Sequence, residues 1–147
     1  MSDPFFAIER IYVKDIVFEA INTPDVFKTE GPTDNNLEMR VNNKPVADDR
    51  YEVELSLNIV SKVKEEKVYR IKIAYAGIFC LKDFPEEQKT RFLQVECPNR
   101  LYPYACGLVS QITTLGTFFP EILQPVDFRY LYQQSQAKQN EEKKYNG

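Results

Sequence analysis

The sequence predicts an α+β fold in which a strand-rich first half precedes a helix-rich second half. Up to about residue 81 the chain is dense in β-branched and aromatic residues, with stretches of strict alternation. After residue 85, apolar residues recur at three- and four-residue steps instead. Strands followed by helices are typical of α+β domains. A length of 147 residues, 43% of them hydrophobic, suits a single domain.

The first strand is expected over residues 5–21. In an extended segment, Ile16 and Phe18 share one face and point opposite to Asp15, Val17 and Glu19, so this strand should have one face in water. Turn-forming residues crowd positions 23–36 and predict a surface connection. A short strand is expected at 37–41.

An antiparallel hairpin is the clearest prediction. Apolar and polar residues alternate strictly over 51–60, and alternation resumes over 69–75. The charged segment 62–67 between them predicts the turn. Gly77 indicates a bulge or a close backbone approach, after which residues 78–81 continue or end the sheet.

Two helices are expected after the sheet. Pro85 can begin a short helix that ends near residue 95, because its fixed φ suits a first turn. A long amphipathic helix should follow from Pro98 to Gly116, with Pro103 early enough for its missing N–H to cost little. The predicted apolar stripe consists of Leu101, Tyr104, Ala105, Leu108, Ile112 and Leu115.

A last helix should begin at Asp127, which is a suitable N-cap residue. Its apolar stripe would contain Phe128, Leu131 and Tyr132. Residues 133–147 are polar and lack periodicity, so they predict a disordered tail within a single domain spanning residues 1–147.

Composition bounds the environment and the partners. The formal net charge of −3 leaves no general basic surface, so nucleic acid is not an expected partner. Three cysteines without CxxC spacing are expected to be reduced thiols. No secretory signal or membrane-spanning run is recognisable, so we expect a soluble cytoplasmic protein that does not insert into membranes.

Catalytic chemistry finds little support in the sequence. Histidine is absent, which removes the commonest general base and the commonest transition-metal ligand. The five glycines form no phosphate-binding loop. Adjacent acids such as Glu86 and Glu87 suit a first helical turn, and Cys97 and Cys106 are expected to be inert. We therefore expect no enzymatic activity, no metal and no cofactor.

The high aromatic content is the feature of the sequence that indicates a binding function. Ten Phe and nine Tyr residues are a heavy load for one small domain, and they need not all fit into its core. Aromatic surface left over after folding would bind a partner subunit or an apolar ligand.

Several segments of this sequence resemble the SecB family of export chaperones. The resemblance covers nearly the whole chain, from about residue 6 to residue 132. The matching segments are Phe6–Glu19, Asn22–Phe27, Ala47–Val53, Ala76–Phe79, Cys97–Ala105, Gly116–Phe118 and Pro125–Phe128. The resemblance implies a four-stranded antiparallel sheet, followed by a long helix and a C-terminal helix, assembled as a dimer of dimers.

The resemblance also implies the function. Members are holdases that bind unfolded precursor proteins in apolar grooves without ATP and deliver them to the translocation motor SecA. By position, the peptide groove here would contain Leu37, Met39, Val41, Tyr69 and Tyr132.

SecA docking would use the polar face of the sheet, where Asp15 and Glu19 match two acidic positions of the family. Arg70 and Lys72 stand where well-known members carry an apolar and an acidic residue, so the docking surface here should be less negative. The short tail also mixes both signs of charge.

Two other functions remain open. A SecB-like chaperone could serve a client outside export, such as an antitoxin, with the same fold and groove. An α+β domain that binds a small ligand would instead need a closed pocket with convergent polar groups.

Overall fold

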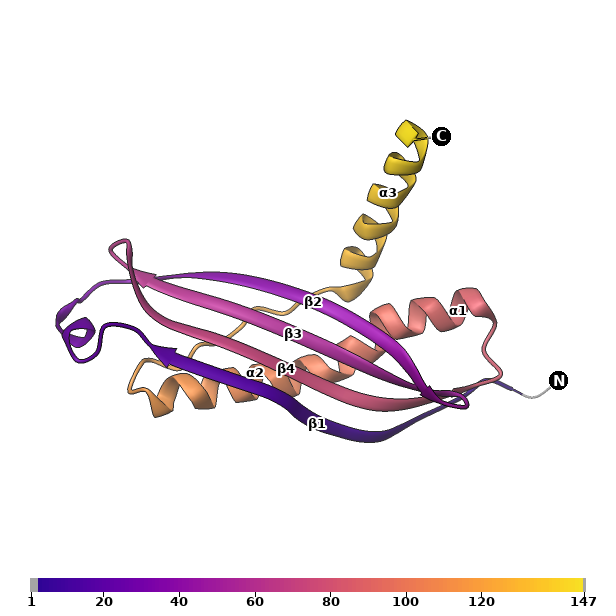
Figure 1. Cartoon of the computed structure of the whole chain (residues 1–147), viewed down its shortest axis with the longest axis horizontal. Coiled ribbons are helices and arrows are strands. Elements are labelled where there is room, and N and C mark those ends of the chain that lie inside the picture. Colours follow the sequence, from indigo (N-terminus) through magenta and orange to yellow (C-terminus); the bar gives the residue numbers. More distant parts are fainter. Residues whose placement is uncertain (1–2, 147) are drawn as a thin grey trace.

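A computed structural model describes residues 3–146 of the chain, and the side chains of residues 3–138. Its first half is a single antiparallel sheet with the strand order β1-β4-β3-β2 (Figure 1). The strands are β1 (Phe5–Ala20), β2 (Thr33–Ala47), β3 (Arg50–Val63) and β4 (Glu66–Lys82). Helices follow in the second half, so the predicted α+β class is confirmed.

The β3–β4 hairpin supplies the centre of the core. Leu57 pairs with Ile73 and Ile59 pairs with Ile71, and all four side chains are at most 1% exposed. The polar residues between them point to the opposite face, as the alternation predicted. One face of the sheet is therefore apolar and covered by α2, and the other is open to water (Figure 1).

Strand β2 is three times longer than the segment 37–41 that the sequence predicted. It pairs with β3 from Thr33 to Ala47, and it includes Asn35 and Asn36, which were expected in a turn. An edge strand with mostly exposed side chains tolerates polar residues, because backbone pairing with a well-ordered neighbour holds it in place.

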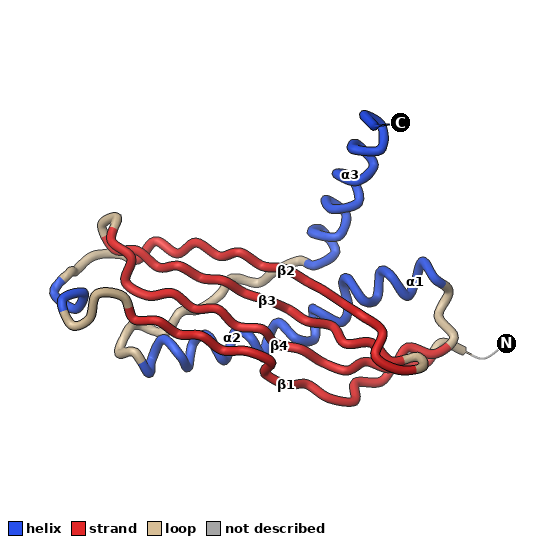
Figure 2. The backbone as a smooth tube through the Cα atoms, viewed as in Figure 1, coloured by secondary structure: helices blue, strands red, loops and turns tan. Residues whose placement is uncertain are grey.

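Strand β1 is the other edge strand, and it contains two irregularities. Its register with β4 shifts between Ile8 and Arg10 and again between Val13 and Asp15, so Glu9 and Lys14 are extra residues. Such bulges bend a strand and redirect side chains. Figure 2 shows the resulting bend in β1.

Gly77 lies opposite Ile11 of β1, and it is a close-approach position rather than a bulge. A Cβ there would lie 2.8 Å from the Phe79 ring and 3.0 Å from the carbonyl oxygen of Arg10. One of the two predicted alternatives is therefore right, and the bulges themselves lie in the partner strand.

The two helices predicted after the sheet form one continuous run. Helix α1 (Glu86–Arg91) passes through a π-helical segment, Phe92–Glu96, into α2 (Cys97–Leu115). Pro103 therefore lies inside a helix and not near its start, contrary to the prediction. Its missing N–H leaves the carbonyl of Asn99 without its helical partner, and because Asn99 is exposed, water can satisfy that group.

The buried stripe of α2 differs from the predicted one. The side chains buried against the sheet are those of Cys97, Leu101, Tyr102, Ala105, Val109, Ile112 and Thr113. Tyr104 and Leu115 were predicted to be in the stripe but are 51% and 77% exposed. The helix therefore has a second apolar face that its own sheet does not cover.

Helix α3 (Phe128–Asn146) extends away from the sheet (Figure 1). Asp127 caps it as predicted, since its Oδ1 accepts hydrogen bonds from the backbone N–H groups of Arg129 and Tyr130. Residues 133–146, predicted to be disordered, continue this helix; Gly147 lies outside the described residues. Gln, Ala, Lys and Glu favour helix even without an apolar stripe, which the periodicity argument did not weigh.

No helix in the described part of the chain has the length and apolar character needed to cross a membrane.

Substituting Gly77→Ala should lower the free energy of unfolding by about 1–3 kcal/mol, because the new methyl group would overpack the contact between Phe79 and β1. Gly107→Ala is the matched control, since nothing lies within 4 Å of its added Cβ and alanine favours helix by about 0.5–1 kcal/mol. Urea unfolding of both variants measures the two changes. An equal stability of the two variants would contradict the close approach at Gly77.

Candidate functional site

An open apolar cavity of about 640 Å³ lies at one end of the sheet. Three parts of the chain form it: the crossover between β1 and β2, the adjoining ends of β3 and β4, and the start of the connection 117–127 between α2 and α3. Its lining residues are Val26, Phe27, Thr29, Glu30, Gly31, Pro32, Thr33, Val63, Val68, Tyr69, Thr117, Phe118, Phe119, Pro120 and Glu121.

Phe118 lies at the centre of an aromatic cluster beside this cavity. Its ring centroid is 4.9 Å from that of Tyr69, 5.7 Å from that of Phe27 and 6.5 Å from that of Phe18. Gly116 permits this packing, because a Cβ at that position would lie 2.7 Å from the Phe18 ring. Rings from four different segments therefore meet at one place.

The crossover holds its part of the cavity through one buried residue. Val26, in the 3-10 helix Asp25–Lys28, is 4% exposed and belongs to the core. Its neighbour Phe27 is 51% exposed and contributes to the cavity lining. The same short helix thus anchors the crossover to the core and presents an aromatic side chain to solvent.

Two hydrogen-bonded anchors hold the connection 117–127 in place. At one end, the buried Thr113 accepts the backbone N–H of Glu121 at its Oγ1 and the N–H of Phe118 at its carbonyl, both at 3.0 Å. Further along, the Tyr102 hydroxyl donates to the carbonyl of Gln124. This segment has no regular secondary structure, so these side chains fix its path.

Glu121 places a carboxylate at the wall of the cavity. Its Oε2 accepts hydrogen bonds from the Asn35 amide at 2.6 Å and from the Tyr69 hydroxyl at 3.2 Å. Burial, reinforced by this carboxylate, raises the pKa of Tyr69 to about 12. Tyr69 is therefore a neutral hydrogen-bond donor at physiological pH.

Large apolar side chains remain exposed around the cavity. Phe119 is 93% exposed and Ile122 is 78% exposed, and both lie on the connection 117–127. Exposed apolar side chains clustered beside an open apolar cavity mark a binding surface. The arrangement suits an extended chain that carries apolar side chains.

The structure brings only one of the predicted groove residues into the cavity. Tyr69 lines it, whereas Leu37, Met39 and Val41 form a row on the helix-side face of β2, in register with Ile59, Leu57 and Leu55. Tyr132 lies on α3, partly buried against the core. The row on β2 begins two residues beyond Asn35, which bonds to Glu121, so it continues from the cavity along the sheet.

The cavity residues that the sequence interpretation missed are Phe27, Phe118, Phe119 and Glu121. Phe27 and Phe118 belong to segments that resemble the family, but neither was assigned to the groove. The adjacent pair Phe118 and Phe119, directly after a helix stop, was the available signal, because two aromatic residues in a connection have no strand or helix face to bury them.

A second candidate surface is the open face of the sheet, defined here as the outward-pointing residues of 10–19, 36–44, 52–60 and 70–78. Asp15, Glu19, Arg70 and Lys72, predicted for docking, all lie on it. Glu19 and Arg70 are in register, and their side chains form an ion pair with a 2.8 Å N–O distance. The negative charge of Glu19 is therefore partly balanced within the chain.

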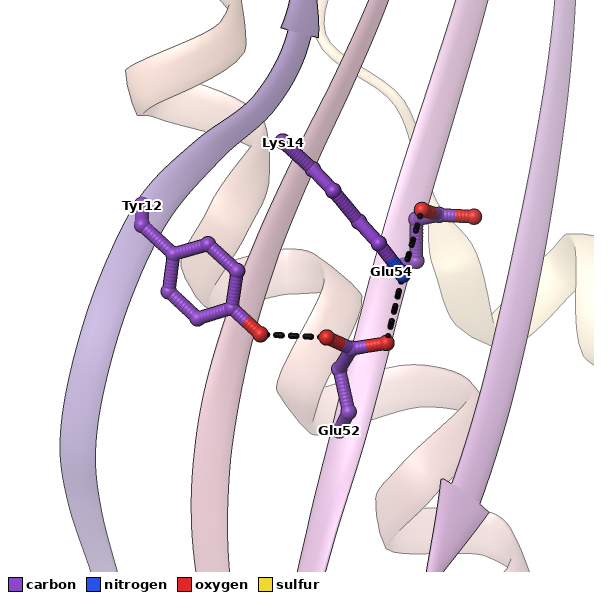
Figure 3. Close-up of polar contacts among 4 residues, drawn as sticks. All are labelled: Tyr12, Lys14, Glu52 and Glu54. Carbon is purple, nitrogen blue, oxygen red and sulfur yellow. Dashed lines mark hydrogen bonds and ion pairs between the residues drawn. The ribbon is translucent and has the colours of Figure 1, made fainter. Parts of the chain in front are cut away.

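Four residues of this face form a hydrogen-bonded cluster (Figure 3). The Tyr12 hydroxyl donates to Glu52, and Lys14 Nζ lies 2.8 Å from Glu52 Oε1 and 3.3 Å from Glu54 Oε1. Lys14, helped by Tyr12, lowers the pKa of Glu52, while burial and Glu52 raise the pKa of Tyr12 to about 12. The side chains of Tyr12 and Lys14 thus reach from β1 across β4 to β3, and Tyr12 is in register with the small residue Ala76 of β4.

Cys97 and a cluster of possible metal ligands would be further reactive sites among the described residues. Cys97 is fully buried, and burial raises the pKa of its thiol, which disfavours the reactive thiolate. Within the described side chains, no three His, Cys, Asp or Glu residues come together as a metal site.

Comparison with known proteins gives consistent matches. A family model described as "Preprotein translocase subunit SecB" matches residues 1–139. A relative from Methylococcus capsulatus is 40% identical over 131 residues, which cover 88% of this chain and 83% of the relative. A relative from Hahella chejuensis is 35% identical over 138 residues, which cover 94% of this chain and 87% of the relative. Both are described as "Protein-export protein SecB".

A solved structure shares the fold. It is a SecB-like chaperone from Mycobacterium tuberculosis in complex with a peptide from an antitoxin, and it matches with a TM-score of 0.69 at 18% sequence identity. The match covers 83% of this chain and 91% of that chain.

The pKa of Tyr69 predicts a pH dependence of stability. Because the folded state binds the phenolic proton more tightly, with a pKa of about 12 against 10.0, the stability that Tyr69 contributes is fully present below pH 10. That stability is lost as the pH rises through about 12. Urea unfolding across this range should show a steeper loss for the wild type than for Tyr69→Phe. Parallel curves for the two proteins would refute the assignment.

Proposed function

The chain belongs to the SecB family and is a chaperone for protein export, and we propose that it is an ATP-independent holdase that captures unfolded precursor proteins and delivers them to SecA. The observation that carries this proposal is the open aromatic cavity at the end of the sheet. The apolar row on β2, with Leu37, Met39 and Val41, would extend the groove beyond Tyr69 and the cavity. Tyr132 is the remaining residue of the proposed groove.

The cavity suits clients that share no sequence motif. An unfolded chain exposes the apolar side chains of its future core, and burying them contributes about 25 cal/mol per Å² of apolar area. Ordering a flexible segment costs several kcal/mol, so a single short contact is weak. Several grooves acting on one long client raise the avidity while each contact stays reversible. Release then requires no ATP hydrolysis by the chaperone.

A homotetramer, arranged as a dimer of dimers, would supply those repeated grooves. Apolar side chains on the helix side of β1, including Ile8, Val13 and Ile16, are each more than a third exposed. Together with Tyr104 and Leu115 on the second apolar face of α2, they leave an apolar surface that a second copy of the chain can cover. These residues support the proposal that the assembly forms through β1 and α2.

SecA would dock on the open face of the sheet, which includes Asp15, Glu19, Arg70 and Lys72. This face lies opposite α2 and the core, so binding there leaves the aromatic cavity accessible (Figure 1). We place the protein in the cytoplasm, where precursors meet the motor, and assign it no catalytic activity, no nucleic-acid partner and no insertion into the membrane.

A second candidate is a SecB-like chaperone for a client outside export. The structural relative that binds an antitoxin peptide favours it. Such a client would occupy the same cavity, and only the partner of the open face would differ. Affinity for SecA separates the two candidates.

The holdase proposal predicts that Phe119→Ser weakens client capture. A phenylalanine contributes about 1.5–3 kcal/mol when a client buries it, so the concentration needed to suppress aggregation should rise by about tenfold. Light scattering of an aggregating unfolded protein measures this concentration. Because Phe119 is 93% exposed in the free chain, its loss should not affect folding.

Val46→Ser is the matched control for that experiment. Val46 is an exposed apolar residue at the opposite end of β2 from the cavity, so its substitution should leave client capture unchanged. Equal capture by both variants, or no suppression by the wild type, would contradict a client site at the cavity.

The docking proposal predicts that Ala74→Phe abolishes or greatly weakens binding to SecA. Ala74 lies in the middle of the open face between Asp15 and Ser56, and a phenyl ring there would obstruct a surface that docks flat on the sheet. Titration of SecA by calorimetry measures the loss, and suppression of aggregation by the same variant serves as the control. If SecA does not bind the wild type, the client lies outside export.

A further inference from the structure

The open face of the sheet carries more positive than negative charge, although the whole chain has a net charge of −3. Six cations stand against five carboxylates, so the face has a formal net charge of +1. The outward-pointing charged residues are Arg10, Lys14, Asp15, Glu19, Glu38, Arg40, Lys44, Glu52, Glu54, Arg70 and Lys72. The negative charge of the chain therefore lies elsewhere.

Ion pairs within the chain take up most of the carboxylates on this face. Glu19 pairs with Arg70, while Glu52 and Glu54 share Lys14. Three carboxylates are thereby engaged by only two cations. Lys14 reaches both carboxylates because it is the extra residue of a β1 bulge, which puts its side chain on the same face as that of Asp15.

Lys72 and Arg40 have no such partner among the described side chains. The register places Lys72 between Val17 and Asn58, and Arg40 opposite Ser56, so neither cation has a carboxylate directly opposite it on a neighbouring strand. Asp15 and Glu19 are diagonal to Lys72 and Glu54 is diagonal to Arg40, but none of them forms an ion pair with these two cations. Both side chains are exposed. Arg70, by contrast, has Glu19 directly in register and is paired.

Among the side chains that the structure describes, the carboxylates of this face that form no ion pair are fewer than the cations that form none. Asp15 and Glu38 are the two that form no ion pair in the described residues, and Asn58 separates Glu38 from Lys72 in their common row. Arg10 and Lys44 are further cations without an ion pair within the described chain, although Lys44 lies opposite Glu52 and helps to lower its pKa. Four cations thus stand against two carboxylates.

The centre of this face is low and flat. Ala74 and Ser56 lie side by side in one row, with Arg40 on one side and Lys72 in the adjoining row. One strand, β3, lies between the strands of Lys72 and Arg40, so the two strands are two inter-strand spacings, or about 10 Å, apart. A segment lying on the small residues would have both cations within reach.

We propose that the open face docks an acidic segment of a protein partner, whose carboxylates are recognised by Lys72 and Arg40. The proposal rests on the open face being the docking surface, and it fixes the sign of the charge that the partner must present there. Charge complementarity carries it, because the carboxylates that could attract a basic partner are mostly engaged within the chain. Arg10 adds to the attraction at the edge of the face.

The experiment compares two peptides of equal length, one rich in glutamate and one rich in lysine, by fluorescence anisotropy at low salt. The glutamate-rich peptide should bind more tightly, and added salt should weaken it. Lys72→Glu and Arg40→Glu should each weaken it by about five- to tenfold, because an exposed attraction becomes a repulsion. Lys28→Glu, which makes the same change of charge in the crossover, should have a much smaller effect.

Suppression of aggregation by Lys72→Glu and Arg40→Glu should equal that of the wild type, because the client cavity is elsewhere. A failure of the holdase assay with intact peptide binding would therefore count against the chaperone proposal alone. Preferential binding of the lysine-rich peptide, weakened by Asp15→Lys, would overturn the acidic partner. Binding of neither peptide would also overturn it. The same holds if Lys72→Glu, Arg40→Glu and Lys28→Glu all leave the binding of the glutamate-rich peptide unchanged.

Discussion

The alternation of β3 and β4 is the constraint on which the rest of the structure depends. One face of the hairpin is buried through Val53, Leu55, Leu57 and Ile59. The residues between them face water, because successive side chains of a strand point to opposite faces. A shift of one residue in register would exchange the two faces completely. Helix α2 covers only one side because only one side is apolar, and the protein therefore keeps a free sheet face.

The aromatic cavity at the end of the sheet depends on a small number of anchors beyond this core. Neither the crossover nor the connection 117–127 has a sheet or helix ladder to hold it, apart from the one short helical turn at Asp25–Lys28. Val26, Thr113 and Tyr102 do so instead, each through burial or a hydrogen bond to the backbone. Phe27 and Phe119 remain 51% and 93% exposed, so the anchored segments present aromatic side chains to solvent.

Sequence reasoning found the features that depend on residues close to one another in the sequence. The β3–β4 hairpin, the Asp127 cap and the close approach at Gly77 all follow from local chemistry. Strand β2 was predicted too short because its order comes from pairing with β3, which no local pattern of polar residues reveals. The apolar stripe of α2 was misplaced because helical spacing alone cannot tell which of two apolar faces meets the sheet.

The candidate site was less accessible to the sequence. Tyr69 was assigned to the groove through the family resemblance, whereas Phe27, Phe118 and Glu121 come together only through the crossover and the connection. Glu19 and Arg70 were assigned to one face, but their ion pair depends on the register between β1 and β4, and Lys14 joins that face only through a bulge.

The cavity and the charged open face lie on opposite sides of the sheet. The cavity is on the helix side at one end, so the single layer of four strands separates the two surfaces. In the proposed function, a client in the cavity and SecA on the open face would occupy the same subunit without competing for space. Capture and transfer would then be successive states of one ternary complex, and the client would not have to dissociate into solvent before it is transferred.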